Sequence, residues 1–255
     1  WIGSKGDGIL KIHNYDVNKS IFDCKIENIT SHNSLLNDNS VYAFAPGTHN
    51  ILWIGNEEGL NYYSYSEKRI KKVDLVHNGI ALKYIHAIYE QGSYLWLASV
   101  GMGAIKARIN WSGDTPVLTV ENRFIRSDGD ISSNYFFSLY PENDRYIWFA
   151  NRGGGIFKIN TETFGVEAIK FPDKIGNKTI NEIISIKQDD SGNYLIGTSF
   201  GLIKYKPDGD YQLFNATNGF PNSTIHCILQ NSGNDFWIST NRGVINYNSE
   251  KETFK

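Results

Sequence analysis

Cysteines, methionines and long apolar runs are scarce in this chain of 255 residues. Two cysteines are too few for a disulfide framework, and there is one methionine. No apolar run approaches the roughly 18 residues of a membrane-spanning helix, so we expect no direct membrane contact. The 25 basic and 27 acidic residues give a formal net charge of −2. This balance argues against a broadly basic nucleic-acid-binding protein.

Glycine and aromatic residues are plentiful instead. The chain has 24 Gly, 15 Tyr, 14 Phe and 6 Trp, a composition that favours strands and tight turns. It starts at Trp1 without an initiator methionine, in the middle of a pattern that recurs later. We therefore expect a piece of a longer protein.

One short pattern recurs six times along the chain. It reads apolar, Trp, apolar, small, and then Gly a few residues later, in segments 1–8, 52–59, 95–103, 147–155, 194–201 and 236–243. We call the Trp position the pivot, and the pivots are Trp1, Trp53, Trp96, Trp148, Leu195 and Trp237. Their spacing of 42 to 52 residues is typical of four-stranded propeller blades.

A second pattern precedes five of the six pivots. It places a small residue between apolar ones, and the segments are 39–44, 83–88, 134–139, 181–186 and 223–228. Turn signals such as Asp189-Asp190-Ser191-Gly192-Asn193 separate the two patterns. The pair predicts a hairpin in which an inner strand is followed by the pivot strand.

The two patterns together predict an all-β fold, a β-propeller of four-stranded antiparallel blades, with a single propeller segment over 1–255. Six pivot strands but five inner strands are present, so the first blade lacks its innermost strand. We expect a seven-bladed propeller of which this chain is a part. The pivots from Trp53 onward are predicted to fill the blade cores rather than to stack on a ligand.

The repeat also resembles a known family. Residues 52–63, Leu-Trp-Ile-Gly-Asn-Glu-Glu-Gly-Leu-Asn-Tyr-Tyr, follow Asn-Ser-Leu-Leu-Asn-Asp-Asn-Ser-Val-Tyr-Ala at 33–43. This arrangement resembles the two-component regulator propeller repeat. The chain departs from that pattern at Ala98, Ala150, Leu195 and Ser239.

The resemblance implies a function and a location. Proteins with this repeat form the periplasmic sensor region of hybrid two-component systems in Bacteroidetes, beside a further propeller, an immunoglobulin-like domain and a histidine kinase. They respond to oligosaccharides and control polysaccharide-utilisation genes. It implies a non-catalytic periplasmic sensor with an oligosaccharide ligand, the remaining receptor domains as partners and a possible homodimer.

Patterns of catalytic or metal-binding chemistry are weak in this sequence. Gly197-Thr198-Ser199-Phe200-Gly201 matches an esterase pattern, but it falls in a strand-to-strand turn of the repeat instead of a strand-to-helix elbow. His86 and His226 occupy equivalent inner-strand positions, where Tyr42 stands in another copy, which favours packing over a pair of metal ligands. We predict no cofactor, no metal and two free thiols.

Ligand recognition is expected in loops at one end of the blades. The loops after the pivot strands offer Lys5, Asp7, Glu57, Glu58, Met102, Arg152, Phe200 and Arg242. The loops before the inner strands offer His32, Asn37, Asn39, Asn134, Phe220 and Asn222. We take as candidates Arg152, Arg242, Lys5, Glu57, Phe200 and Asn134.

Each candidate has a plainer interpretation. Arg152 and Arg242 suit a carboxylate or sulfate through bidentate bonds, or they simply solvate exposed turns. The repeated Asn before the inner strands could cap turns. Trp111, in a predicted insertion, is either exposed for binding or packed beneath its loop.

Two other functions stay open. One is a propeller-type enzyme, either a lyase or a glycosidase. A glycosidase would need an opposed carboxylate pair. A purely structural protein-interaction propeller is the other alternative.

Overall fold

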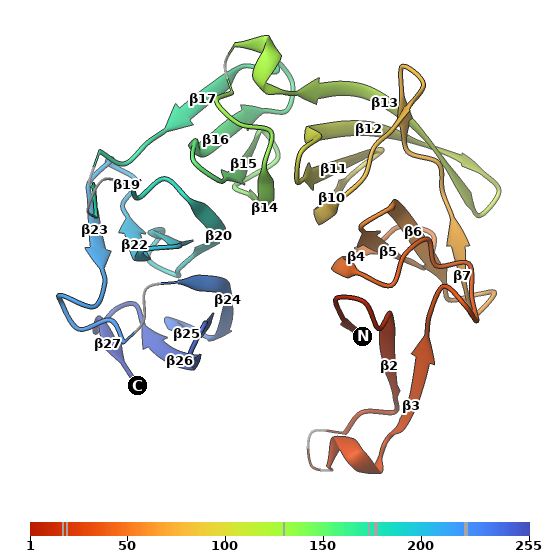
Figure 1. Cartoon of the computed structure of the whole chain (residues 1–255), viewed down its shortest axis with the longest axis horizontal. Coiled ribbons are helices and arrows are strands. Elements are labelled where there is room, and N and C mark those ends of the chain that lie inside the picture. Colours follow the sequence, from red (N-terminus) through yellow and green to blue (C-terminus); the bar gives the residue numbers. More distant parts are fainter. Residues whose placement is uncertain (17, 19, 130, 173, 176–177, 222–223) are drawn as a thin grey trace. The chain divides into compact units, whose positions relative to one another are not determined.

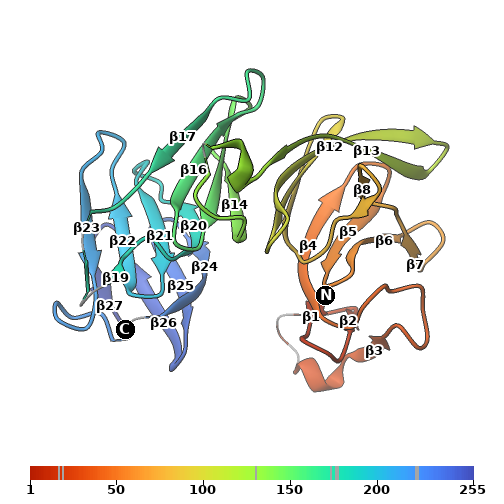
Figure 2. The same ribbon diagram turned by 45° about the horizontal axis from the view of Figure 1, so that its top comes forward.

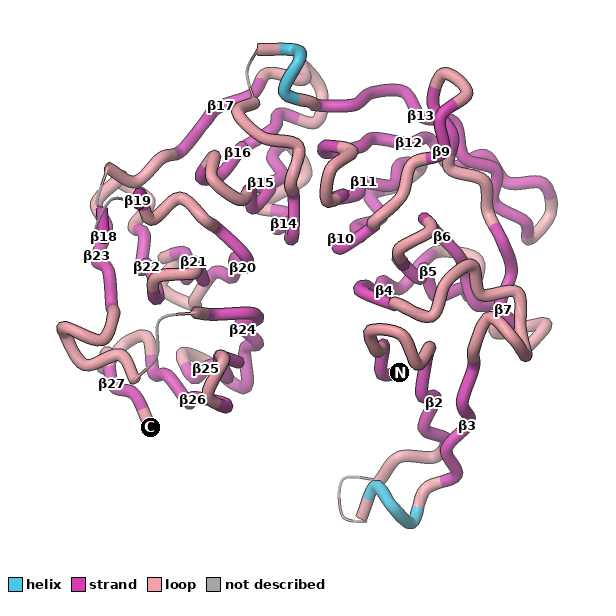
Figure 3. The backbone as a smooth tube through the Cα atoms, in the orientation of Figure 1, coloured by secondary structure: helices cyan, strands magenta, loops and turns pink. Residues whose placement is uncertain are grey.

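The computed structural model describes all residues of the chain except 17, 19, 130, 173, 176–177 and 222–223. It divides into two compact units, Trp1–Phe124 and Ile125–Lys255. Both consist of antiparallel sheets whose strands follow one another along the chain (Figure 1). Among the described residues, helix is confined to the 3₁₀ turns η1 (Ile21–Asp23) and η2 (Arg126–Asp128), drawn in cyan in Figure 3.

The first unit contains three blades. The first is a three-stranded sheet of β1 (Ile2–Gly3), β2 (Ile9–His13) and β3 (Lys25–Ile29). The second has four strands, β4 (Val41–Gly47), β5 (Ile51–Asn56), β6 (Gly59–Ser64) and β7 (Arg69–Lys72). The third has β10 (Ile85–Gln91), β11 (Tyr94–Ser99), β12 (Gly103–Ser112) and β13 (Thr115–Phe124). A small hairpin of β8 (Val76–His77) and β9 (Ile80–Ala81) lies between the last two.

The second unit contains three four-stranded blades. They are β14 (Phe136–Pro141), β15 (Tyr146–Asn151), β16 (Gly155–Asn160) and β17 (Val166–Ile169); β20 (Ile183–Gln188), β21 (Tyr194–Thr198), β22 (Gly201–Tyr205) and β23 (Tyr211–Phe214); and β24 (Ile225–Ser232), β25 (Asp235–Thr240), β26 (Gly243–Asn248) and β27 (Thr253–Phe254). The pair β18 (Lys174–Ile175) and β19 (Lys178–Thr179) forms a further hairpin.

These sheets confirm the predicted blades. Trp53, Trp96, Trp148, Leu195 and Trp237 all lie on the second strand of a four-stranded sheet. The first sheet has three strands, as expected from its missing inner-strand pattern. The extra residues predicted around Trp111 lengthen a hairpin: β12 and β13 have 10 residues each, and Figure 2 shows them reaching beyond their neighbours in the first unit.

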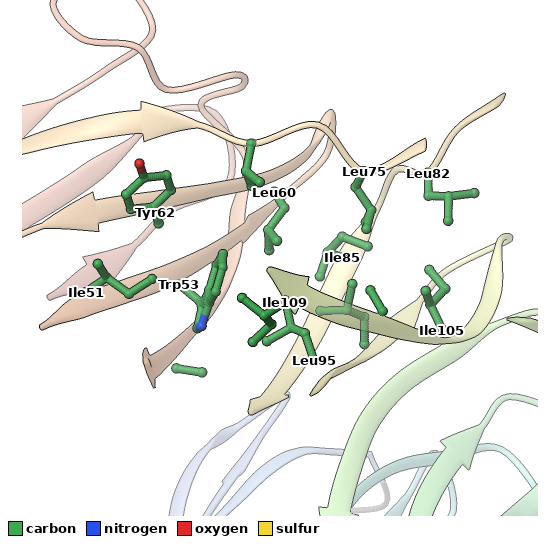
Figure 4. Close-up of a cluster of buried hydrophobic side chains, with 14 residues drawn as sticks. Ile51, Trp53, Leu60, Tyr62, Leu75, Leu82, Ile85, Leu95, Ile105 and Ile109 are labelled. Carbon is green, nitrogen blue, oxygen red and sulfur yellow. The ribbon is translucent and has the colours of Figure 1, made fainter. Parts of the chain in front are cut away.

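Burial shows what the pivots do. Trp53 and Trp96 are fully buried, and Leu195 is too. Trp53 belongs to a cluster that includes Ile85 and Leu95 of the next blade (Figure 4). Burying one large aromatic side chain against the neighbouring sheet in this way supplies much of the adhesion between blades.

The same arrangement recurs in the second unit. The ring of Trp148 stacks on that of Tyr194 in the next blade, with centroids 4.0 Å apart. Leu195 shares a cluster with Ile225 and Phe236 of the blade after it. Each of these pivots therefore packs against the blade that follows it in the sequence.

Trp237 corrects the prediction of a uniformly buried series. Its side chain is 43% exposed, and Leu229 and Val244 of the same blade are 60% and 64% exposed. The physical reason is that Trp53, Trp148 and Leu195 are each covered by the following blade of their own unit, whereas this sequence contains no blade after that of Trp237. The repeat pattern alone predicts the residue type at this position, whereas burial depends on the neighbour.

Candidate functional site

The inner strands share an irregularity that the sequence did not reveal. In β4, Val41 pairs with Asn56 and Ala43 pairs with Gly55, so Tyr42 is an extra, unpaired residue. The same register shift occurs in all five inner strands, and the extra residues are Tyr42, His86, Phe137, Ile184 and His226. A β-bulge re-aims a side chain and is common beside functional sites.

Two of the bulge residues contact the turn after the pivot strand of their own blade. The Tyr42 hydroxyl donates to a Glu57 carboxylate oxygen at 3.2 Å. His226 in the second unit lies 2.6 Å from the Asn241 side-chain oxygen, in the equivalent turn. The two histidines predicted as equivalent thus occupy equivalent bulges in separate units. We call the surface formed by the bulge residues and these turns the turn face.

In the first unit the turn face holds an aromatic pair beside a carboxylate. The Tyr42 and His86 rings stack with centroids 4.1 Å apart and planes at 12°. Burial lowers the pKa of His86 to about 4, against the opposing effect of the Glu57 charge. The pKa of Tyr42 is raised, mainly by burial and to a smaller extent by the charge of Glu57. Near neutral pH the pair is therefore an uncharged stack next to an anion.

Backbone bonds fix this arrangement. The amide of Glu57 donates to the carbonyl of Ser40 at 3.1 Å, and its carbonyl accepts from the amide of Tyr84 at 2.9 Å. The neighbouring Glu58 pairs with the Lys83 ammonium. The turn of one blade is thereby tied to the start of the next inner strand, which preorganises the turn face.

The predicted candidates fall on both units. Lys5 lies in the first, where it forms an isolated bridge with Ser40, and Glu57 contacts Tyr42 there as described. Arg152 lies in the second unit, with its guanidinium Nε 3.8 Å from a Glu182 oxygen and its side chain 59% exposed. Arg242 is exposed on the turn before β26.

Two candidates have structural roles. Phe200 is half-buried and packs against the apolar cluster around Trp148. Asn134 uses its side-chain oxygen to accept from the Arg126 amide at 2.6 Å, which stabilises the loop before β14. Asn181 does the same for the Phe171 amide at 2.8 Å. This agrees with the turn-capping interpretation of the repeated Asn.

Trp111 is half-buried and stacks on His49, with centroids 3.9 Å apart, so the packed interpretation is correct. Ser199 lies in the turn between two strands, β21 and β22, which excludes an esterase elbow there. Cys24 and Cys227 are free. Asn222 lies outside the described residues.

Among the residues that the structure describes, no three His, Cys, Asp or Glu side chains gather where they could hold a metal ion. The described helices, each one short turn, have neither the length nor the apolarity of a membrane span.

Comparison with known proteins identifies the fold. No protein-family model matches the sequence. The chain is 22% identical over 260 residues to "Histidine kinase P4" of Formosa agariphila, an alignment that covers 97% of this chain and 18% of the kinase. The chain thus spans less than a fifth of that relative.

Solved structures of extracellular domains of two-component systems also match this chain. The extracellular domain of the hybrid two-component system BT3049 from B. thetaiotaomicron matches with a TM-score of 0.74 and 20% identity, over 100% of this chain and 32% of that one. The extracellular domain of BT4673 from the same organism matches with 0.77 and 17%, over 99% and 34%. An enzyme shares the fold as well: virginiamycin B lyase from Staphylococcus aureus matches with 0.64 and 16%, over 91% and 73%.

These matches confirm the predicted β-propeller fold. They also confirm the resemblance drawn from the repeat, because two of the matched structures are extracellular domains of hybrid two-component systems. At these identities the likeness concerns the fold, and fold alone does not determine function. The chain is therefore a β-propeller segment, similar over almost its whole length to part of such extracellular domains.

Proposed function

We propose that this chain is the non-catalytic ligand-sensing part of a periplasmic receptor of the hybrid two-component type. The observation that carries the proposal is the alignment of 97% of the chain with a histidine kinase, joined by the matches to extracellular receptor domains. The remaining receptor domains would transmit the signal, and pairing of two copies would be one way to do so.

The proposed ligand is an oligosaccharide released from a polymer. Its binding to the receptor would switch on polysaccharide-utilisation genes. The turn face of the first unit supports this choice. The stacked rings of Tyr42 and His86 offer an apolar surface beside the Glu57 carboxylate, which accepts hydrogen bonds from hydroxyl groups. A flat ring next to a carboxylate suits a sugar, because a sugar has an apolar face and a polar rim.

Calorimetric titration of the chain with neutral and acidic oligosaccharides tests this assignment. For a bound sugar, Glu57→Gln should weaken binding about tenfold, since a charged hydrogen bond is lost. Glu162→Gln is the matched control, because Glu162 is exposed in the turn between β16 and β17. It should leave affinity unchanged.

Arg152→Ala and Arg242→Ala give the competing result. If either of them abolishes binding while Glu57→Gln has no effect, the ligand site lies on the second unit and the assignment to Glu57 is wrong. Failure of every oligosaccharide to bind would refute the proposed ligand.

A further inference from the structure

A groove lies at the outer edge of the first unit, away from the bulge residues. Its volume is about 640 Å³, within the usual range for ligand sites. It runs between the edge strands β3 and β7, with the loop before β4 along one side. Its lining includes Glu27, Asn28, Leu35, Tyr63, Lys68 and Arg69.

One wall of the groove is a loop without regular secondary structure, and side-chain hydrogen bonds hold this loop in place. The Asn61 amide nitrogen donates to the Leu35 carbonyl at 2.9 Å, and its oxygen accepts from the Asn37 amide at 2.9 Å. Asn33 donates to the Asn28 carbonyl at 2.9 Å and accepts from the Thr30 amide at 2.7 Å. Because these bonds already order the loop in the free protein, binding a ligand costs little further conformational entropy there.

The opposite wall is fixed by contacts of Tyr63. The Lys11 ammonium donates to its hydroxyl at 2.6 Å, and the Trp1 ring packs edge-on with centroids 4.7 Å apart. The Tyr63 side chain is 3% exposed, while Leu35 across the groove is 50% exposed. The groove thus has a rigid wall at Tyr63 and one exposed apolar side chain, Leu35, on the other side.

The charged groups of the groove that are not engaged in ion pairs carry a positive charge. The Glu27 carboxylate is already engaged by His13 at 2.9 Å and Lys11 at 3.8 Å. Arg69 pairs with Glu67. Within the described residues, the exposed ammonium of Lys68 has no anionic partner. An anionic group could therefore enter without breaking an existing pair.

We propose that this groove binds an acidic saccharide, with Lys68 as the contact for its carboxylate or sulfate. The exposed Asn28 amide at the edge of β3 provides hydrogen bonds for hydroxyl groups, and Leu35 packs against an apolar sugar face. The site is separate from the turn face and stands whether or not a sugar binds at Glu57.

Three probes with related backbones test the proposal: a galacturonic acid tetrasaccharide, a sulfated galactose tetrasaccharide and a neutral galactose tetrasaccharide. Calorimetry should show binding of the uronate, the sulfate or both, and which of them binds identifies the anion. The neutral probe should bind at least tenfold more weakly, and added salt should weaken the acidic probe. Amide hydrogen exchange should slow in 30–35 and 67–70 on binding.

The variants locate the site. Lys68→Gln should weaken the acidic probe at least fivefold. The matched control is Lys72→Gln, since Lys72 is exposed at the end of β7, the strand that follows Lys68, but lies outside the groove lining, and it should leave affinity within twofold. Glu57→Gln should also leave it unchanged, which separates this site from the turn face.

Three results would overturn the proposal. They are equal binding of the neutral probe, equal losses in Lys68→Gln and Lys72→Gln, and absence of binding by all three probes.

Discussion

At the scale of single residues, the pivots show how one repeated residue type can have two environments. Trp53 is fully buried against the next blade, whereas Trp237 is 43% exposed in the last blade. Both lie in copies of the same repeat pattern, although Ser239 replaces the Gly, so we attribute the difference in burial to the neighbouring blade. This contrast allows a direct measurement of adhesion between blades.

We predict that Trp53→Ala destabilises the first unit by about 3–5 kcal/mol, as expected for a cavity left by a buried Trp. Trp237→Ala should cost about 1 kcal/mol or less, because its side chain has already kept much of its contact with water. Urea unfolding of both variants measures the two losses. Equal losses would contradict the explanation by neighbouring blades.

His86 should make stability depend on pH. Burial lowers its pKa from 6.5 to about 4, so the unfolded chain binds more protons between these two values. The stabilisation is present above pH 6.5 and is lost as the pH falls towards 4. Because the ring is partly accessible, we expect the loss to be about 1–2 kcal/mol.

The variant His86→Phe keeps a ring to stack on Tyr42 and removes the titrating group. Denaturant unfolding of both proteins from pH 7 to pH 4 should give a flatter stability curve for the variant. The slope of stability against pH should be steeper for the wild type, by the equivalent of up to one proton bound on unfolding. Parallel curves would show that His86 does not titrate as its burial requires.

At the scale of strands, the Gly that follows the pivot has a packing reason. A Cβ at Gly55 would lie 2.5 Å from the carbonyl oxygen of Ile85, in the next inner strand. The equivalent distances are 2.8 Å from Gly3 to the Val41 carbonyl and 2.6 Å from Gly197 to an Ile225 methyl. At these three positions the next inner strand comes too close for a side chain, whereas Ala98, Ala150 and Ser239 stand at the equivalent positions of the other blades.

We predict that Gly55→Ala destabilises the first unit by about 1–3 kcal/mol, since a backbone carbonyl cannot easily move away. Gly92→Ala is the control: no atom lies within 4 Å of its Cβ, and its positive φ alone should cost about 1 kcal/mol. Thermal unfolding compares them. A larger loss in Gly92→Ala would mean that contact between blades is not the reason for Gly55.

Strands were predictable from the sequence where local pattern determines them. Turn residues and the pivot repeat located the hairpins correctly, because both depend on near neighbours in the chain. The bulge at Tyr42 was not predictable, since it becomes apparent only when the pairing of Val41 and Ala43 with β5 is known. For the same reason the sequence treated Tyr42 and His86 as packing residues.

At the scale of the whole molecule, most of the fold was predictable and the candidate site was predictable in part. Glu57 was selected for its loop, and the structure adds its partners Tyr42 and His86. Asn134 was selected from a repeated position, but it binds backbone within its own unit. The outer groove was missed, because it joins two edge strands through a loop whose conformation depends on Asn61.

The central claim is that the chain binds an oligosaccharide without transforming it. The most direct test is to titrate the chain with the oligosaccharide panel in a calorimeter and then to analyse the same sample by chromatography. We predict saturable heat for at least one oligosaccharide and its complete recovery after prolonged incubation. Cleaved or unsaturated products would contradict the account and would place the chain with propeller enzymes.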